Sequence, residues 1–266
     1  MRAAVQALCL PMPGWSSKTE TRMSPELIYG IILMALPTVM SLTIHEFAHA
    51  RTAQAFGDLT AKGMGRCTFN PLAHLDPIGT IGLLLGGFGW AKPVPVNSGN
   101  MHPQRLGDIA VSAAGPLSNL ALAGLSAVVL RVLALKGVAV NVGEQYAPMD
   151  LAVFLLTFMV MINLNLFLFN LIPLFPLDGH HIGRETIGAA KRYGYMQWQM
   201  QYGRWVLLGL IIAPMFLRRT PLAGWDPLSL YMSYVMHPLT QWILGPDAWT
   251  LRWDVLAKFS HYLPWF

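Results

Sequence analysis

The stretch His45-Glu46-Phe47-Ala48-His49 lies at the end of the first long apolar run of this chain. On a helix, residues four positions apart share one face, so His45 and His49 can offer imidazole nitrogens to one metal ion. Glu46 would then lie beside that ion. Zinc takes nitrogen ligands readily, and a neighbouring carboxylate can accept a proton from zinc-bound water. The motif predicts a metal hydrolase with two histidine ligands and Glu46 as general base.

The run that leads into this motif carries no charge from Leu27 to Ile44. A helix that continues through the motif is long enough to cross about 30 Å of hydrocarbon at roughly 1.5 Å per residue. Two His and a Glu would then lie at membrane depth, where ionisable groups are costly and usually functional. The alternative is a helix end that merely reaches the interface, which explains the polarity of the motif but not its spacing.

The composition predicts a polytopic membrane protein. Hydrophobic residues make up 54% of the chain and charged residues 12%, whereas a globular domain has about 25% charged residues. The net charge of +5 is scattered among loops, which suits a lipid bilayer and excludes a nucleic-acid-binding face. Cys9 and Cys67 are too few for a disulfide framework, and we expect both to be apolar fillers.

Three long apolar runs predict an all-α bundle of about four to six transmembrane helices. The strong spans are Pro25–Phe56, Ile109–Leu130 and Leu151–Leu177. Between the first two, Ile78–Trp90 is short and rich in glycine, which favours a re-entrant or interfacial hairpin. The Lys92–Asn97 segment must be extended, because Pro93 and Pro95 hold their neighbours out of helical geometry; we expect it to form a strand-like edge.

The chain divides into three parts. Residues 1–23 are predicted to be a disordered extension, 24–204 the core that carries the metal motif, and 205–266 further membrane helices with an interfacial tail. Trp205–Leu217 is short for a span, and Pro227–Pro246 is apolar enough to cross. The tail carries four aromatic residues typical of a membrane interface, which are Trp249, Trp253, Tyr262 and Trp265.

A third ligand could come from Asp178, which follows two prolines at the broken end of the third span. The alternative is a cap or turn aspartate before Gly179. His74, Asp76 and His102 are further candidates, although loop residues of these types are more often turn formers or solvated groups. One three-ligand set predicts one zinc ion per chain.

Basic residues set the expected orientation. The loop from Asp178 to Arg204 is the densest basic connection between strong spans, which places it in the cytoplasm. If the glycine-rich segment does not cross, the first and third spans both run inward. The two metal motifs then lie at one depth, towards the cytoplasmic face.

Together these motifs resemble the site-two protease family of intramembrane zinc metalloproteases. The resemblance covers about residues 25–185. It rests on the HEFAH motif, on Gly115-Pro116 through Asn119, and on Asn170-Leu171-Ile172-Pro173 leading to Leu177-Asp178-Gly179. Asn70-Pro71, His74, Asp76-Pro77 and the stretch Gly89 to Asn97 are similar to the compact bacterial branch, which lacks appended peptide-binding or nucleotide-sensing domains.

The resemblance implies zinc ligation by His45, His49 and Asp178, with Glu46 as general base. It also implies that Asn165, Asn170 and Asn119 contact the substrate. For Asn119, in a span rich in small residues, the residues themselves favour a packing role between helices. The role of His180 stays open, because the family usually has a small residue there. A location in the bacterial cytoplasmic membrane and transmembrane protein or peptide substrates follow from the same resemblance.

Two other functions remain open at this point. One is a transporter or channel that uses the same His, Glu and Asp side chains as an ion pathway. The other is a non-catalytic metal-binding scaffold, against which the intact Glu46 argues. The sequence does not decide the substrate or the oligomeric state.

Overall fold

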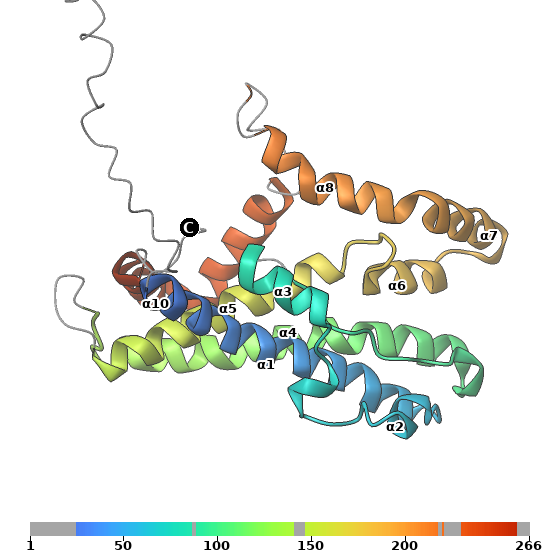
Figure 1. Cartoon of the computed structure of the whole chain (residues 1–266), viewed down its shortest axis with the longest axis horizontal. Coiled ribbons are helices and arrows are strands. Elements are labelled where there is room, and N and C mark those ends of the chain that lie inside the picture. Colours follow the sequence, from blue (N-terminus) through green and yellow to red (C-terminus); the bar gives the residue numbers. More distant parts are fainter. Residues whose placement is uncertain (1–24, 87–88, 141–146, 218–219, 221–229, 260–266) are drawn as a thin grey trace, which may run out of the picture.

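The computed structural model describes residues 25–86, 89–140, 147–217, 220 and 230–259. Within these ranges the fold is all-helical, as predicted, with one isolated β-bridge between Leu75 and Ala91. Three long helices pack side by side (Figure 1), namely α1 (Pro25–Ala55), α4 (Gln104–Leu135) and α5 (Pro148–Asn170). The expected disorder of residues 1–23 lies outside the described residues.

The long helices follow the three predicted apolar runs closely, except at one end. Helix α5 ends at Asn170, seven residues before the predicted end of the third span. Proline disfavours helical geometry in the residue before it, so Pro173 and Pro176 stop the helix. The chain turns there and starts a new helix, α6 (Asp178–Thr186).

The connection between α1 and α4 begins and ends at the same end of the bundle. The backbone N–H of His102, just before α4, donates to the carbonyl of Phe56, just after α1, at 2.9 Å. This connection therefore does not cross the length of the bundle, as the orientation argument requires. Its described residues form four short helices, which are α2 (Thr60–Gly63), η2 (Pro71–Ala73), α3 (Pro77–Gly86) and η3 (Ser98–Asn100).

Helix α3 forms the first arm of the segment predicted to be a glycine-rich hairpin. The Asp76 carboxylate accepts from the Gly79 N–H at 2.8 Å and caps its first turn. A Cβ on Gly79 would lie 2.2 Å from the carbonyl oxygen of Trp90, so the chain after α3 returns to the start of the same helix. Ten residues span about 15 Å at 1.5 Å per residue, half the thickness of a hydrocarbon core.

The loop candidates for metal ligation have structural roles or none. His74 is buried, and its Nε2 is hydrogen-bonded to the carbonyl of Thr68 at 2.8 Å. Asp76 caps α3, and His102 is exposed. Among the described residues, none of the three belongs to a cluster of metal-ligand type.

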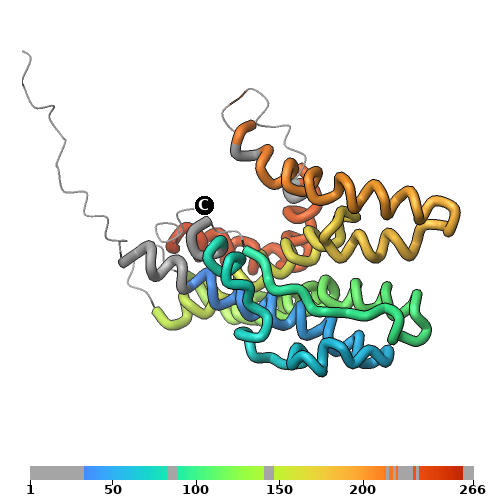
Figure 2. Tube along the Cα trace, turned by 45° about the vertical axis from the view of Figure 1, so that its right-hand side comes forward, coloured from blue at the N-terminus to red at the C-terminus, as the bar shows by residue number. Residues whose placement is uncertain are grey.

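After α6, the chain forms an arm beside the long helices. Helix α7 (Ala189–Trp198), a π-helical turn η4 (Gln199–Gly203) and α8 (Arg204–Leu217) follow one another. In Figures 1 and 2, this arm and α2 lie on opposite sides of the long helices. The buried Gln199 side chain ties the arm to the turn after α5, because it accepts from the Phe175 N–H and donates to the Pro173 carbonyl.

The last described helix closes the end of the bundle away from α6. Helix α10 (His237–Phe259) follows the π-helical turn η6 (Met232–Met236) and packs against α4 and α5. It kinks at Gly245, whose φ of 70° is in the left-handed region that favours glycine. Trp249 and Trp253 belong to this packed helix, whereas Tyr262 and Trp265 lie outside the described residues.

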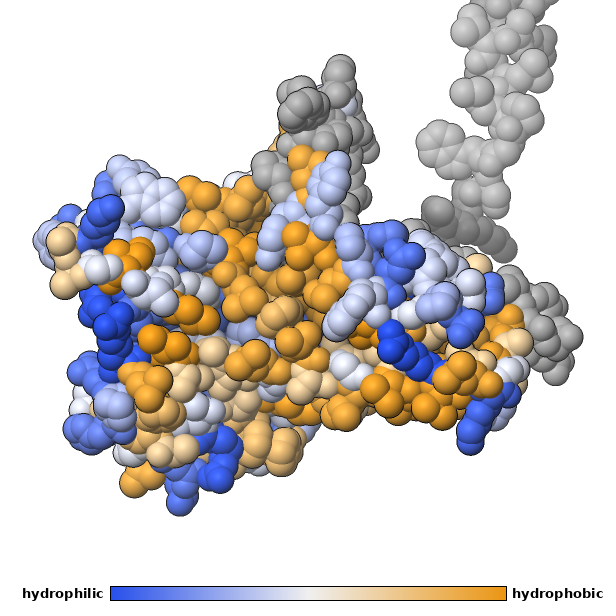
Figure 3. All heavy atoms as spheres, turned by 180° about the vertical axis from the view of Figure 1, so that it is seen from behind, coloured by the Kyte–Doolittle hydropathy of each residue, from blue (hydrophilic) through white to orange (hydrophobic). Residues whose placement is uncertain are grey.

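The outer surface suits a bilayer. Among the described helices, α4 and α5 are long and apolar enough to cross a membrane. Large apolar side chains of α4 face outward, including Leu117, Leu125 and Val128. Figure 3 shows hydrophobic residues across the middle of one face and hydrophilic residues toward both of its ends.

Candidate metal centre and active site

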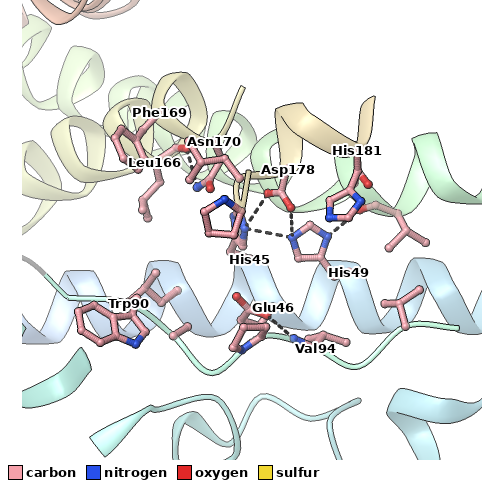
Figure 4. Close-up of a pocket in the computed structure, with 18 of the residues that line it drawn as sticks. His45, Glu46, His49, Trp90, Val94, Leu166, Phe169, Asn170, Asp178 and His181 are labelled. Carbon is pink, nitrogen blue, oxygen red and sulfur yellow. Dashed lines mark hydrogen bonds and ion pairs between the residues drawn. The ribbon is translucent and has the colours of Figure 1, made fainter. Parts of the chain in front are cut away.

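Helix α1 brings His45 and His49 together, as their spacing predicts. Both side chains are buried, and their Nε2 atoms lie 3.1 Å apart (Figure 4). Helical geometry continues through the motif because α1 runs without a break to Ala55. The two nitrogens that can bind a metal therefore point to one place.

Asp178 approaches the same place from the start of α6. Its Oδ2 lies 3.2 Å from His45 Nε2, and its Oδ1 lies 3.4 Å from His49 Nε2. A ligand atom from each of the three residues lies within 4.8 Å of the others. Gly179 allows this approach, since a Cβ there would lie 2.4 Å from the Leu171 carbonyl oxygen at the end of α5.

A buried amide network orients His45. The Asn119 Nδ2 donates to Asn163 Oδ1 at 2.7 Å and to the Ser41 carbonyl, so Asn119 Oδ1 is left to face His45 Nδ1 at 2.6 Å. That oxygen can only accept, so the proton of His45 sits on Nδ1 and Nε2 keeps its lone pair. His49 has the same arrangement, with its Nδ1 2.6 Å from the Val111 carbonyl oxygen.

These contacts make the centre fit a cation. Two imidazole lone pairs and a carboxylate converge, which is unfavourable without a positive charge between them. Asp178 Oδ2 is buried and has no hydrogen-bond donor among the described residues. Gly115 of α4 leaves space for a cation beside the histidines, because a Cβ there would lie 2.3 Å from His49 Nε2. Two nitrogens and one carboxylate are a ligand set that catalytic zinc takes.

Glu46 faces another side of α1 than the two histidines. Its side chain is 9% exposed, and its Oε2 accepts a hydrogen bond from the Val94 backbone N–H at 3.1 Å. Figure 4 shows the carboxylate between α1 and the extended segment that contains Val94. This position beside the metal centre, with no contact to a cation side chain among the described residues, suits a group that accepts protons.

A cavity of about 780 Å³ opens onto the centre. The three ligand residues and Glu46 line it together with apolar side chains from several helices. The apolar lining of α5 and α8 includes Leu166, Phe169, Leu207, Leu208 and Ile211. The cavity therefore combines a polar centre with a wall suited to an apolar chain.

The predicted substrate-binding asparagines have different positions. Asn170 lines the cavity, and its Nδ2 donates to the Leu166 carbonyl at 3.0 Å. Asn165 is exposed and does not line the cavity. Asn119 is fully buried against His45, so its amide is engaged with a metal ligand and not directed at the cavity.

Two features of the site were not predicted as parts of it. Ser41 and Asn163 complete the network behind Asn119, with Asn163 Nδ2 donating to Ser41 Oγ at 2.8 Å. A signal for Ser41 exists in the sequence, since it lies one helical turn before His45 on the same face. The second feature is the hydrogen bond from the Val94 amide to Glu46, which no local sequence pattern predicts.

Of the two histidines after Gly179, only His181 lines the cavity. His180 is buried beside Tyr195, with ring centroids 5.4 Å apart in a stacked arrangement. It therefore packs α6 against α7, and it lies on the side of α6 away from the cavity lining.

The comparisons with known proteins agree with this site. The model of Peptidase family M50 matches residues 33–210. A relative from Bacillus subtilis, named "Putative zinc metalloprotease YwhC", is 39% identical over 220 residues, which cover 80% of this chain and 98% of the relative. "Putative zinc metalloprotease Rip2" from Mycolicibacterium smegmatis is 32% identical over 180 residues, 62% of this chain and 64% of the relative. No solved structure matches this chain.

Proposed function

Because the chain belongs to Peptidase family M50 and is a zinc metallopeptidase, we propose that it hydrolyses peptide bonds within or near transmembrane segments of membrane proteins. The resemblance to site-two proteases is confirmed by the family match. The observation that carries the proposal is the buried cluster of His45, His49 and Asp178 beside Glu46, on helices whose outer faces are apolar. A soluble peptidase has no need of such a surface.

We place the chain in the bacterial cytoplasmic membrane, crossing it about four to six times. Helices α4 and α5 meet the length and hydropathy of spans, and α1 carries an uncharged run of similar length. The basic residues Arg184, Lys191, Arg192 and Arg204 lie in the region from α6 to the start of α8, and Arg184 and Arg204 line the cavity at the centre. By the positive-inside rule, the centre faces the cytoplasm.

A labelling experiment tests this orientation. Gly188 is exposed between α6 and α7. In a background with Cys9 and Cys67 changed to serine, Gly188→Cys should resist impermeant thiol reagents added to intact cells and react after the cells are opened. Ready labelling in intact cells would invert the proposed topology.

One zinc ion per chain, held by His45, His49 and Asp178, would act as a Lewis acid and lower the pKa of a bound water towards about 7. Glu46 then accepts a proton from the attacking water and delivers it to the leaving amine. Its contact with the Val94 amide holds the carboxylate on one side of the centre. Asn119 orients His45, and we assign it to that task and not to the substrate.

A helical substrate must unwind before cleavage, because its carbonyls are engaged in hydrogen bonds. The extended segment Lys92–Asn97 borders the cavity through Pro93, Val94 and Val96 and can pair with an unwound chain as a strand pairs with an edge. Asn170 lies on the opposite wall and can bind a substrate carbonyl or amide.

Glu46→Gln tests the mechanism, since it keeps size and polarity but removes the base. Reconstituted with a model transmembrane substrate, this variant should cleave about 10²- to 10⁴-fold more slowly, the range that general-base catalysis contributes. Its zinc content should match that of the unchanged protein. Near-normal cleavage would contradict the protease mechanism, and zinc loss would make Glu46 a ligand.

A further inference from the structure

The segment Lys92–Asn97 is held in place from outside the cavity. It has no strand partner along its length within the described chain, and only Ala91 just before it forms a bridge. Pro93 and Pro95 have no N–H, which leaves the segment few backbone donors. Something other than a sheet must therefore keep it beside Glu46.

Arg66 provides the first anchor. Its side chain is 5% exposed, and its Nη2 donates to the carbonyl oxygens of Lys92 and Pro93. The Lys92 N–H donates in turn to the His74 carbonyl at 2.7 Å. Hydrogen bonds from a charged donor are roughly twice as strong as neutral ones. The start of the segment is thus fixed by a buried guanidinium.

Asp58 provides the second anchor, at the other end of the segment. Its side chain is fully buried and accepts from the Asn97 N–H at 2.7 Å and from Asn100 Nδ2 at 3.0 Å. It also accepts from the N–H and hydroxyl of Thr60. Burial alone would raise the pKa of Asp58, but these hydrogen bonds outweigh burial and hold its pKa below the usual range.

Neither anchor belongs to the centre itself. Asp58 and Arg66 do not line the cavity and are not among the metal ligands. Between them, the Val94 N–H reaches Glu46. The carbonyl of Val94 and both backbone groups of Val96 form no hydrogen bond with other described residues. The middle of the segment, which lines the cavity at Val94 and Val96, therefore keeps backbone groups with which a bound chain can pair.

We propose that Asp58 and Arg66 are positioning residues, which hold Lys92–Asn97 as a preformed edge for the unwound substrate and keep the Val94 amide on Glu46. The inference rests on the proposed function, because it assigns the edge to the substrate. A preformed edge lowers the entropy that the substrate loses on binding. Loosening it should weaken substrate binding more than it slows the chemical step.

Steady-state kinetics in liposomes test whether the anchors affect substrate binding more than the chemical step. With a transmembrane substrate, Asp58→Asn and Arg66→Met should raise KM about tenfold, which corresponds to a loss of about 1.4 kcal/mol in binding free energy. Their kcat should change by no more than about threefold, and zinc content should stay at one per chain. Arg66→Lys, which can still donate to one carbonyl, should recover part of the loss.

Matched controls separate position from loss of charge. Arg51→Met removes an exposed arginine of α1 whose one hydrogen bond to the described residues goes to Gln54. Asp247→Asn removes an exposed carboxylate of α10. Both should keep the KM of the unchanged protein. Glu46→Gln should show the opposite division, with kcat reduced and KM nearly unchanged.

Hydrogen exchange gives a readout that needs no turnover. The amides of Lys92, Val94 and Asn97, which are hydrogen-bonded in the folded protein, should exchange faster in Asp58→Asn and Arg66→Met, while peptides from α4 and α5 keep their protection. If no transmembrane substrate is cleaved by the unchanged protein, the proposed function fails, and exchange alone decides whether the anchors act. Unchanged exchange and KM, or loss of zinc and global protection in every anchor variant, would overturn the inference.

Discussion

The two ends of the helical bundle differ in the kinds of side chain that they bury. At the site end, where α1 meets α6, the buried side chains include His45, His49 and Asn119, with hydrogen bonds that set their direction. At the far end, where α10 meets α4 and α5, most of the buried residues are apolar, such as Phe154 and Val255, although one ion pair is buried among them. Hydrogen bonds at the site end thus orient the side chains of the centre, whereas packing at the far end stabilises the fold.

Helix α4 takes part in both ends and shows the difference within one element. A Cβ on Gly115 would lie within 2.6 Å of both histidine Nε2 atoms, whereas a Cβ on Gly124, nine residues later, would meet nothing within 4 Å. The same residue type is thus required at one position and replaceable at the other. Substitutions at the site end should reduce zinc and activity, and those at the far end should reduce stability.

The largest effect is expected from His49→Ala. It removes one of three ligands, so purified protein should lose most of its zinc. Cleavage should fall by more than the roughly 10²- to 10⁴-fold expected for loss of the base alone. Metal analysis and cleavage are measured on the same preparation. Full zinc occupancy in this variant would show that the ligand set is wrong.

The far end should respond to Lys258→Ala with a loss of stability. Lys258 Nζ contacts Asp150 Oδ2, and both side chains are nearly inaccessible. Removing one partner of a buried ion pair costs about 3–5 kcal/mol, because the other charge is left uncompensated. Reversible denaturation measures this loss, with the exposed Lys136→Ala as control.

Zinc content per folded molecule should not change in Lys258→Ala. The double variant Asp150→Asn, Lys258→Met should recover much of the stability, since no charge is left buried alone. A loss of zinc at unchanged stability would contradict the division between the two ends.

Gly115→Ala sharpens the comparison within α4. The added methyl group collides with His45 and His49, and overpacking of this kind costs about 1–3 kcal/mol. We expect weaker zinc binding at nearly unchanged helix content. Gly124→Ala is the control, and it should be neutral or slightly stabilising because alanine favours helices. Equal zinc affinity in both variants would refute the proposed role of Gly115.

Asn119→Ala should have a smaller effect on the same measurement. Loss of a group that orients a metal ligand typically costs about 10- to 100-fold in metal affinity or activity. Zinc affinity should fall within this range, while Asn165→Ala leaves it unchanged, because Asn165 is exposed and touches no ligand. If Asn119→Ala raised KM and left zinc affinity intact, Asn119 would bind substrate after all.

Helical periodicity alone predicts that His45 and His49 lie together, and the structure confirms this. Asp178 could be proposed because a broken helix end and an Asp-Gly pair are local signals. The three long apolar runs predict α1, α4 and α5. Where proline follows, as after Asn170, the helix stops earlier than the apolar run, because hydropathy does not record backbone geometry.

The partners of these residues could not be predicted in the same way. Whether Asn119 faces a substrate or a histidine depends on how α4 rotates against α1, which is a result of packing. In the sequence, Asp58 and Arg66 look like ordinary loop residues. Only the return of the chain after α3 brings Asn97 to Asp58 and Lys92 to Arg66. Such long-range pairs leave no periodic pattern in the sequence.

The smallest expected effect is a pH dependence that belongs to Asp58. Its pKa is lower in the folded protein than the usual value of about 3.9. The folded state therefore gains stability above that pH, and the gain is lost as pH falls through the folded pKa. The free energy of unfolding, measured by denaturation between about pH 3 and 6, should fall less steeply with decreasing pH in Asp58→Asn than in the exposed control Asp247→Asn. The same pH dependence of the unfolding free energy in the two variants would mean that Asp58 is not a charged anchor.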